Sequence, residues 1–247
     1  MNNEFRSKFL LVIYDNSPES MLDVDISKNT IYKHDTFNLG LYTAYNYALD
    51  ICRDNKIEWL TVFDQDTLIP SDFFSKLYTK SSTSSKEVGC IVPDVRLSNG
   101  KKISPGIIED QLFILKNQKN RTRVAINSGN TIHVSSFDKT KPLFSKRYPL
   151  DFLDYDFFLR LSKKDLKIEE LAVTEIQNLS VSNFSEMNVK RFKSFINYEN
   201  KFVNDYYRNM RKQYALRLLV RILKLLGKKN QHDKVKIIFD AIKDNIK

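Results

Sequence analysis

The chain has 247 residues, of which 42% are hydrophobic and 12% aromatic, and this composition provides for a sizeable buried core rather than disorder. It has no run of about 18 apolar residues, and its N-terminus (MNNEFRSKF) lacks the apolar centre of a secretory signal, so we expect an intracellular protein without a membrane span. The net charge is +10, but residues 190–247 alone hold 16 basic and 5 acidic residues. The charge therefore belongs to the C-terminal part, which excludes polyanion binding as a property of the whole chain.

The first predicted elements are two strands and a helix. Residues 9–14 (FLLVIY) form a short apolar run that ends at Asp15 and a turn, and a weaker strand at 30–33 leads to the Phe-Asn-Leu-Gly turn at 37–40. An amphipathic helix follows, with apolar residues at helical spacing: Leu41, Ala44, Tyr45, Ala48 and Ile51.

The next strand, 59–63, ends in Asp64-Gln65-Asp66, and further strands are expected at 88–93 and 126–134 with a hairpin turn at 98–106. Alternating strands and helices predict an α/β fold with a mostly parallel sheet covered by helices. In such sheets ligands bind beyond the carboxyl ends of the strands. The polar residues expected at those ends are Asp15, Asn38, Asp64 and Asp66.

Two acidic clusters each allow a structural and a functional interpretation. Asp64 and Asp66 could cap the helix that begins near residues 71–72, or one carboxylate could accept a bond from a sugar hydroxyl while the other reaches a divalent cation on a diphosphate. In LDFLDYDFFLRL, the acids Asp151, Asp154 and Asp156 could pair with Arg160 on a helix. Alternatively, Asp154 lies among aromatic residues, which favours a raised pKa and a general base.

From residue 188 the pattern is helical. In residues 214–228 the cations Arg217, Arg221, Lys224 and Lys228 recur on one side, and leucines and an isoleucine occupy the other: Leu218, Leu219, Ile222, Leu225 and Leu226. So much leucine argues against a nucleic-acid face. We expect a catalytic domain at 1–187 and a basic helical extension at 188–247, whose apolar side packs on its own domain, on a second copy or partner chain, or on an anionic membrane through 190–228.

Cys52 and Cys90 lie in apolar segments without a nearby cysteine partner, which indicates buried reduced thiols. The three histidines, at 34, 133 and 232, have no spacing typical of a metal site, so we assign them surface or packing roles.

The order of LLVIYDNS, NLGLYTAYNYAL, WLTVFDQDTLIP, INSGN and LDFLDYDFFLRL resembles that of the family 2 glycosyltransferases, and within them the rhamnosyltransferase-like branch, where D-Q-D is frequent. The resemblance covers about residues 9–185. It implies a GT-A fold, a Rossmann-like and mostly parallel sheet with flanking helices that binds nucleotide-diphospho-sugars. It also implies an inverting, metal-dependent hexosyl or rhamnosyl transfer.

By the same resemblance, Asp15 contacts the nucleotide base and Asn38 lies near the nucleotide. Asp64 binds the ribose region, and Asp66 is the metal ligand for Mn²⁺ or Mg²⁺. Asp154, six residues before Arg160, is the implied catalytic base. Ser128 and Gly129 are implied to lie beside the acceptor pocket.

The sequence departs from the family pattern at three places. The family usually opens with an earlier strand whose T-Y-N-like turn lines the base pocket, whereas only about eight residues precede the first strand here. Leu153 stands where an acid commonly precedes the base, and Asn178 stands where a late metal-ligating histidine is expected, near 178–183. These departures keep open the alternative of an inactive or partner-dependent homologue that acts as a subunit.

A lower alternative comes from FDQDTL, which also resembles the motif of the haloacid dehalogenase-like phosphatases. That family has Thr or Val where Leu68 stands, and it carries the motif on its first strand, whereas two predicted strands precede the motif here. The function we expect is transfer of rhamnose or a hexose from a nucleotide-sugar donor to a saccharide or lipid-linked saccharide. The implied setting is bacterial capsule or O-antigen synthesis, in the cytoplasm or peripherally on the inner face of the cell membrane. No nucleic-acid partner is expected.

Overall fold

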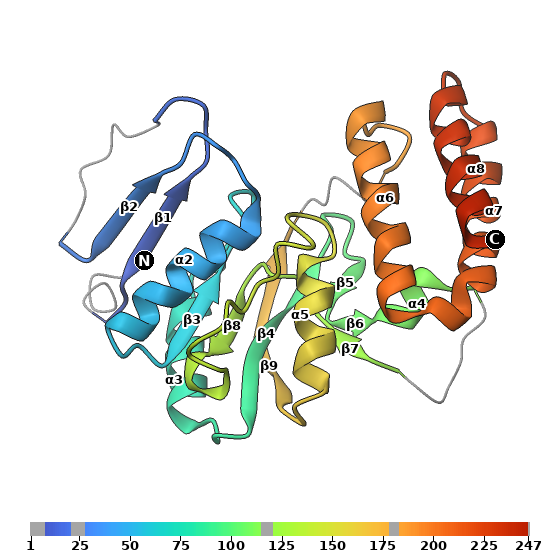
Figure 1. The fold of residues 1–247 in the computed structure, drawn as a ribbon. Coiled ribbons are helices and arrows are strands. Elements are labelled where there is room, and N and C mark those ends of the chain that lie inside the picture. Colours follow the sequence, from blue (N-terminus) through green and yellow to red (C-terminus); the bar gives the residue numbers. More distant parts are fainter. Residues whose placement is uncertain (1–7, 21–27, 115–120, 178–182, 247) are drawn as a thin grey trace.

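The computed structural model describes residues 8–20, 28–114, 121–177 and 183–246, and it has an α/β architecture with a central sheet between helices (Figure 1). The strands are β1 (Leu11–Asp15), β2 (Thr30–His34), β3 (Trp59–Val62), β4 (Val88–Arg96), β5 (Lys102–Ser104), β6 (Gly106–Ile107), β7 (Arg123–Val124), β8 (Asn130–His133) and β9 (Lys167–Ile176). The helices are α2 (Leu41–Asp54), α3 (Phe73–Thr83), α4 (Ile108–Leu112), α5 (Leu153–Ser162), α6 (Val189–Tyr206), α7 (Arg211–Leu226) and α8 (His232–Ile246).

The main sheet is mixed. Its order is β3-β8-β4-β5, with β9 also paired to β4. Strand β8 runs antiparallel to both β3 and β4, whereas β9 runs parallel to β4, so β3, β4 and β9 share one direction. Strands β1 and β2 form a separate parallel pair. The predicted α/β class with flanking helices is confirmed, and the antiparallel β8 in the middle of the sheet is the feature that strand–helix alternation did not indicate.

Strand β4 supplies side chains to both faces of the sheet, which places a core on each side. Cys90 and Val92 join the larger cluster with α2 and α5, while Val88 and Ile91 join a smaller cluster with α3. Both cysteines are buried free thiols, as predicted. Helix α2 thus covers one face of the sheet and α3 the other (Figure 1).

The turn before α2 requires a glycine. Gly40 has a φ of 110°, and a Cβ there would lie 2.4 Å from the carbonyl oxygen of Pro149. This close approach brings the 37–40 turn against the segment that leads into α5. Two parts of the chain about 110 residues apart therefore meet at the start of α5.

The C-terminal helices share the larger core with the sheet domain. Phe192 and Phe202 of α6, Leu218 of α7 and Ile238 of α8 are all buried in the cluster that contains α2 and α5. Asn188 caps the start of α6 by accepting a hydrogen bond from the Arg191 backbone N–H at 2.8 Å.

The prediction that Arg221 belongs to an exposed cationic stripe is wrong. Its guanidinium is buried and donates to the Glu199 carboxylate at 2.6 and 3.0 Å, and Tyr214 donates to the same group at 3.0 Å. A buried carboxylate on α6 needs a counter-charge, and Arg221 is within reach. The apolar residues of α7 also divide between two faces, with Leu218, Ile222 and Leu225 buried and Leu219 and Leu226 exposed.

In the described part of the chain, no helix combines the length and the apolar character that crossing a membrane would need.

Candidate active site

Asp64 directly follows β3 and is held by two side chains from distant parts of the chain. The Tyr45 hydroxyl of α2 donates to its Oδ1 at 2.9 Å, and Gln177, just after β9, donates from Nε2 to its Oδ2 at 3.1 Å. Burial raises the pKa of Asp64, and the two hydrogen bonds oppose that rise. Among the described residues, the side-chain hydrogen bonds of Asp64 are with Tyr45 and Gln177, and none joins its carboxylate to α3.

Asp66 is exposed, and the loop that carries it is fixed by the residue after it. Thr67 donates its backbone N–H to the Asp64 carbonyl at 3.2 Å, and its hydroxyl is hydrogen-bonded to the hydroxyl of Ser128. Ser128 is fully buried. The 64–67 loop is therefore anchored to the turn before β8, which leaves the Asp66 carboxylate directed to solvent.

Gly129 is the second glycine that the backbone requires. Its φ is 69°, its N–H donates to the Val62 carbonyl at 2.9 Å, and a Cβ there would lie 2.6 Å from Glu175 Oε1. Ser128 and Gly129 are both buried, so their contacts in this structure are with the 64–67 loop, β3 and Glu175.

The three acids around the start of α5 differ in their partners. Asp151 forms a two-pronged ion pair with Arg191 at 2.5 and 2.6 Å, and Asp156 accepts from Arg160 at 2.8 Å and from the Tyr206 hydroxyl at 2.5 Å. Asp154 accepts a bond from the Tyr155 backbone N–H at 2.8 Å, and no side chain in the described ranges donates to it. Asp154 is thus the acid of this cluster with capacity left for another partner.

The pKa of Asp154 is raised to about 7, first by burial and further by the negative charges of Asp64 and Asp151. Burial raises the pKa of Tyr45, and the negative charges of Asp64 and Asp154 raise it further. Asp154 and the Asp64 end of the 64–66 motif therefore lie in one electrostatic environment. A carboxyl group with a pKa near 7 suits general-base catalysis at neutral pH.

The backbone before Asp154 is held in an uncommon conformation by aromatic packing. Phe152 has a φ of 65°, which side chains of its size rarely adopt. Its ring packs on Tyr155, Phe195 and Phe202, with ring centroids 5.5, 5.6 and 5.1 Å away. The stacking contacts from α6 fix the direction in which α5 starts, and with it the position of Asp154.

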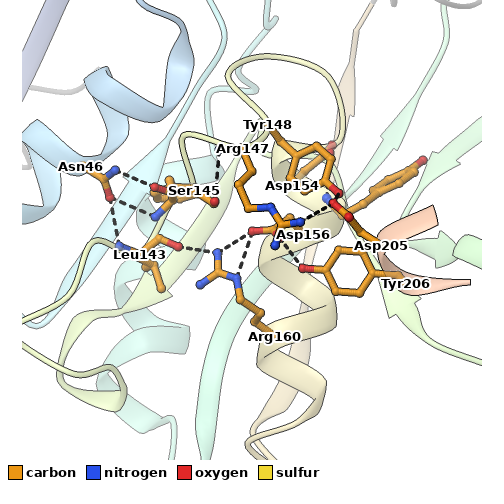
Figure 2. A network of polar contacts seen from close by, with 12 residues as sticks. Asn46, Leu143, Ser145, Arg147, Tyr148, Asp154, Asp156, Arg160, Asp205 and Tyr206 are labelled. Atoms are coloured by element: carbon orange, nitrogen blue, oxygen red, sulfur yellow. Dashed lines mark hydrogen bonds and ion pairs between the residues drawn. The ribbon is translucent and has the colours of Figure 1, made fainter. Parts of the chain in front are cut away.

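A polar network holds the segment before α5 (Figure 2). Asn46 of α2 accepts from the Leu143 backbone N–H at 3.0 Å, and Arg160 of α5 donates to the Leu143 carbonyl at 2.5 Å. On the other side, Asp205 of α6 accepts from Arg147 and from Tyr148, both at 2.7 Å. The segment is tied to α2, α5 and α6, so the C-terminal helices help to position the catalytic candidate.

Asp15 and Asn38 lie apart from this group, on the β1–β2 side. Asp15 accepts from the Tyr32 hydroxyl at 2.5 Å and from the Ser17 N–H at 2.9 Å, and Asn16 donates to Asn38 Oδ1 at 3.1 Å. These bonds join residues within the 15–38 segment, on the β1–β2 side. The structure brings together Tyr45, Asp64, Asp154 and Gln177, with Asp66 and Ser128 on the adjoining loops.

Three residues of this region escaped the sequence analysis: Tyr45 as a polar partner, Gln177 and Glu175. Tyr45 was assigned only to the apolar side of its helix, although a buried tyrosine hydroxyl requires a partner. Glu175 follows Leu171 and Val173 at alternating positions of β9, so a charged residue in a buried register was the available signal. Neither of its carboxylate oxygens has a partner in the described structure, and burial raises its pKa to about 7.

Asp66 is the acid of the 64–66 motif whose carboxylate is open to solvent and to a cation. In the part of the chain that the structure describes, no three His, Cys, Asp or Glu side chains form a metal cluster. Asp66 offers one exposed carboxylate, and sites for Mg²⁺ commonly combine one or two carboxylates with substrate phosphates rather than a complete protein cage. Asn178, the position compared with a histidine, lies outside the described residues.

The family model described as Glycosyl transferase family 2 matches residues 10–140, more than half of the chain. The chain belongs to glycosyl transferase family 2. As a member of this family it is a glycosyltransferase that uses a nucleotide-sugar donor and a saccharide acceptor. The match includes the 64–66 motif and the turn at 128–129 and ends before α5. Neither the search of curated proteins nor that of solved structures found a match.

Proposed function

We propose that this family 2 glycosyltransferase is an inverting enzyme whose catalytic base is Asp154. One observation carries the proposal: Asp154 is the acid at the start of α5 that no described side chain neutralises, and it shares its electrostatic environment with Asp64. Its neighbours Asp151 and Asp156 are each paired with an arginine, so they are poor candidates for proton transfer.

In the proposed reaction, Asp154 removes the proton of an acceptor hydroxyl as that oxygen attacks the anomeric carbon of the donor sugar. The bond from the anomeric carbon to the diphosphate oxygen breaks in the same step, and the electron pair leaves with the nucleoside diphosphate. The configuration at the anomeric carbon is inverted. Asp64, fixed by Tyr45 and Gln177, orients the ribose part of the donor.

Asp66 would hold a divalent cation, Mn²⁺ or Mg²⁺, jointly with the donor diphosphate. When bound, this cation supplies charge neutralisation to the departing diphosphate. Asp15 and Asn38, on the β1–β2 side, are proposed to contact the nucleotide. Ser128 and Gly129 are proposed to shape the acceptor side, because the buried Ser128 supports the 64–67 loop through Thr67 and Gly129 donates to the end of β3 at Val62.

The finer assignments rest on the resemblance. The D-Q-D spelling favours a deoxythymidine diphosphate rhamnose donor, followed by uridine diphosphate hexoses. The acceptor is proposed to be a saccharide or lipid-linked saccharide of a bacterial surface polysaccharide. Residues 1–187 form the proposed catalytic domain, with 188–247 as a helical extension that also supports α5. An inactive homologue that acts as a subunit is the second candidate, favoured by Leu153, which stands where an acid commonly precedes the base.

The test is a screen of nucleotide sugars for thermal stabilisation, with and without Mn²⁺. A donor at 100 times its Kd should stabilise the protein by about 2.7 kcal/mol. Asp66→Ala should lose the Mn²⁺-dependent part of the shift, whereas Asp50→Ala, which removes an exposed aspartate of α2, should keep it. No shift with any donor would favour the inactive homologue, and a normal Mn²⁺-dependent shift in Asp66→Ala would remove Asp66 from metal binding.

A further inference from the structure

Helix α7 exposes a continuous row of leucines. Leu216, Leu219, Leu223 and Leu226 have exposed fractions of 43, 42, 69 and 65%, and their spacing of three or four residues places them on one face. The opposite face, with Tyr214, Leu218, Ile222 and Leu225, is buried in the core. We call the four exposed residues the leucine row. The helix is thus apolar on both sides, and the buried side alone accounts for its packing on the domain.

The surroundings of the leucine row are basic. Helix α7 contains five cations and no acidic residue. Arg221 is neutralised by Glu199, while Lys212 and Lys224 are exposed and have no ion pair among the described residues. Lys212 lies one turn before Leu216, on the same face, and Lys224 follows Leu223 on the side of the helix that carries Arg217 and Arg221. Lys228 and Lys229 follow its end.

The neighbouring helix adds further exposed apolar residues. Helix α8 packs against α7 and exposes Phe239 and Ile246, with exposed fractions of 46 and 64%. Lys236 and Lys243 flank these residues and are exposed. Lys243 is paired with Asp240 at 3.5 Å, and α8 also carries Asp233 and Asp244. The exposed apolar residues therefore extend over both helices, whereas the unpaired cations beside them in the described structure lie mainly on α7.

We propose that the leucine row is a docking surface for an anionic lipid bilayer. The apolar side chains would enter the boundary between headgroups and acyl chains while the lysines contact anionic headgroups. The helix would lie on the bilayer rather than cross it, because its 16 residues extend about 24 Å, less than the hydrocarbon core of about 30 Å, and one face is buried in the protein.

The positive charge of α7 favours an anionic bilayer over a second copy of the chain as the partner of the leucine row. A two-fold contact through the leucine row would bring the cations of one α7 against those of the other, and like charges across an interface oppose association. An anionic bilayer complements the same cations. The inference concerns the C-terminal helices and goes beyond the proposed reaction, so it holds whichever sugar is transferred.

The experiment is sedimentation of the full-length protein with vesicles of phosphatidylglycerol and phosphatidylcholine, compared with phosphatidylcholine alone, at low and high salt. We expect binding that needs the anionic lipid and weakens with salt. Leu223→Gln/Leu226→Gln should reduce partitioning at least tenfold. Leu11→Gln, an exposed leucine of β1, should not.

The matched charge test compares two double variants. Lys212→Gln/Lys224→Gln should weaken binding by about 10- to 30-fold, at roughly 5-fold for each cation near the surface. Lys86→Gln/Lys139→Gln removes the same charge from exposed positions elsewhere and should bind like the wild type. Equal effects of the two pairs, binding to neutral vesicles that ignores salt, or a dimer that the leucine variants dissociate in the absence of vesicle binding would each overturn the proposal.

Discussion

Asp154 is distinguished from its neighbours by its lack of a counter-charge. Asp151 and Asp156 are more buried, but each has an arginine partner, which offsets the cost of burying the charge. Asp154 has only a backbone N–H and two neighbouring carboxylates, so its charged form is disfavoured and its pKa rises to about 7. Asp154 can thus exchange a proton near neutral pH.

This pKa predicts the pH dependence of catalysis. A base must be deprotonated to accept a proton, so kcat/KM should fall about tenfold per pH unit below pH about 7 and level off above it. The measurement is initial rate against pH with the donor identified by thermal shift. A rate that stays constant from pH 5 to pH 8 would contradict the assignment.

Glu175 predicts a pH dependence of stability instead. Burial raises the pKa of Glu175 from 4.5 to about 7. Between pH 4.5 and about 7, the folded chain therefore holds a proton on Glu175 that the unfolded chain has released. The contribution of the protonated carboxyl group to the free energy of unfolding is fully present below about pH 4.5 and is lost as the pH rises through about 7. Glu175→Gln stays neutral, so it should raise Tm relative to the wild type at pH 8 and change it little at pH 5.

The control for that comparison is Glu58→Gln, which replaces an exposed glutamate just before β3. It should leave Tm within about 1 °C of the wild type at both pH values. If Glu175→Gln changes Tm equally at pH 5 and pH 8, Glu175 is not the group that titrates.

At the scale of elements, α6 and α7 are joined by charges inside the core. Arg221 and Glu199 are both buried, and Tyr214 also bonds to the glutamate. Helix α6 in turn supplies Arg191, Asp205 and Tyr206 to the network that holds the start of α5. The helical extension therefore helps to hold Asp154 in place, although its positive net charge distinguishes it from the rest of the sequence.

Removing one partner of the buried pair should be costly. Arg221→Met leaves Glu199 charged and unpaired in the core, and we expect a loss of about 3–5 kcal/mol, or roughly 10 °C in Tm for a chain of this length. Arg217→Met, on the same helix without an ion pair in the described structure, serves as the control and should cost far less. Thermal unfolding of the two variants checks this prediction. Equal decreases in Tm would show that the buried pair contributes no more to stability than an unpaired arginine.

At the scale of the whole molecule, the sequence predicted those elements whose pattern lies in residues adjacent along the chain. The apolar run before Asp64 and the spacing in α2 are local patterns, and the structure has a strand and a helix there. The insertion of β8 between β3 and β4 is not local. Neither is the bond from Gln177 to Asp64, which joins residues 113 positions apart.

The same limit explains the error at Arg221. Helical periodicity assigns every cation of α7 to a solvent face, because it contains no information about the carboxylate of Glu199 on the preceding helix. For the candidate site, the sequence named Asp64, Asp66 and Asp154, and their roles stay predictions. Local patterns indicate that Tyr45 and Glu175 are buried polar groups, but which residues they and Gln177 contact depends on the order of the strands.

The central claim is that Asp154 is the base of an inverting sugar transfer, and the most direct measurement compares Asp154→Asn with the wild type. Both proteins are assayed at pH 8 for donor-induced thermal stabilisation and for acceptor-dependent release of nucleoside diphosphate, with Asp50→Asn as the exposed control. We predict an unchanged donor shift and a rate lowered by about 100-fold or more, the scale of general-base catalysis. Equal rates in Asp154→Asn and the wild type would contradict the account.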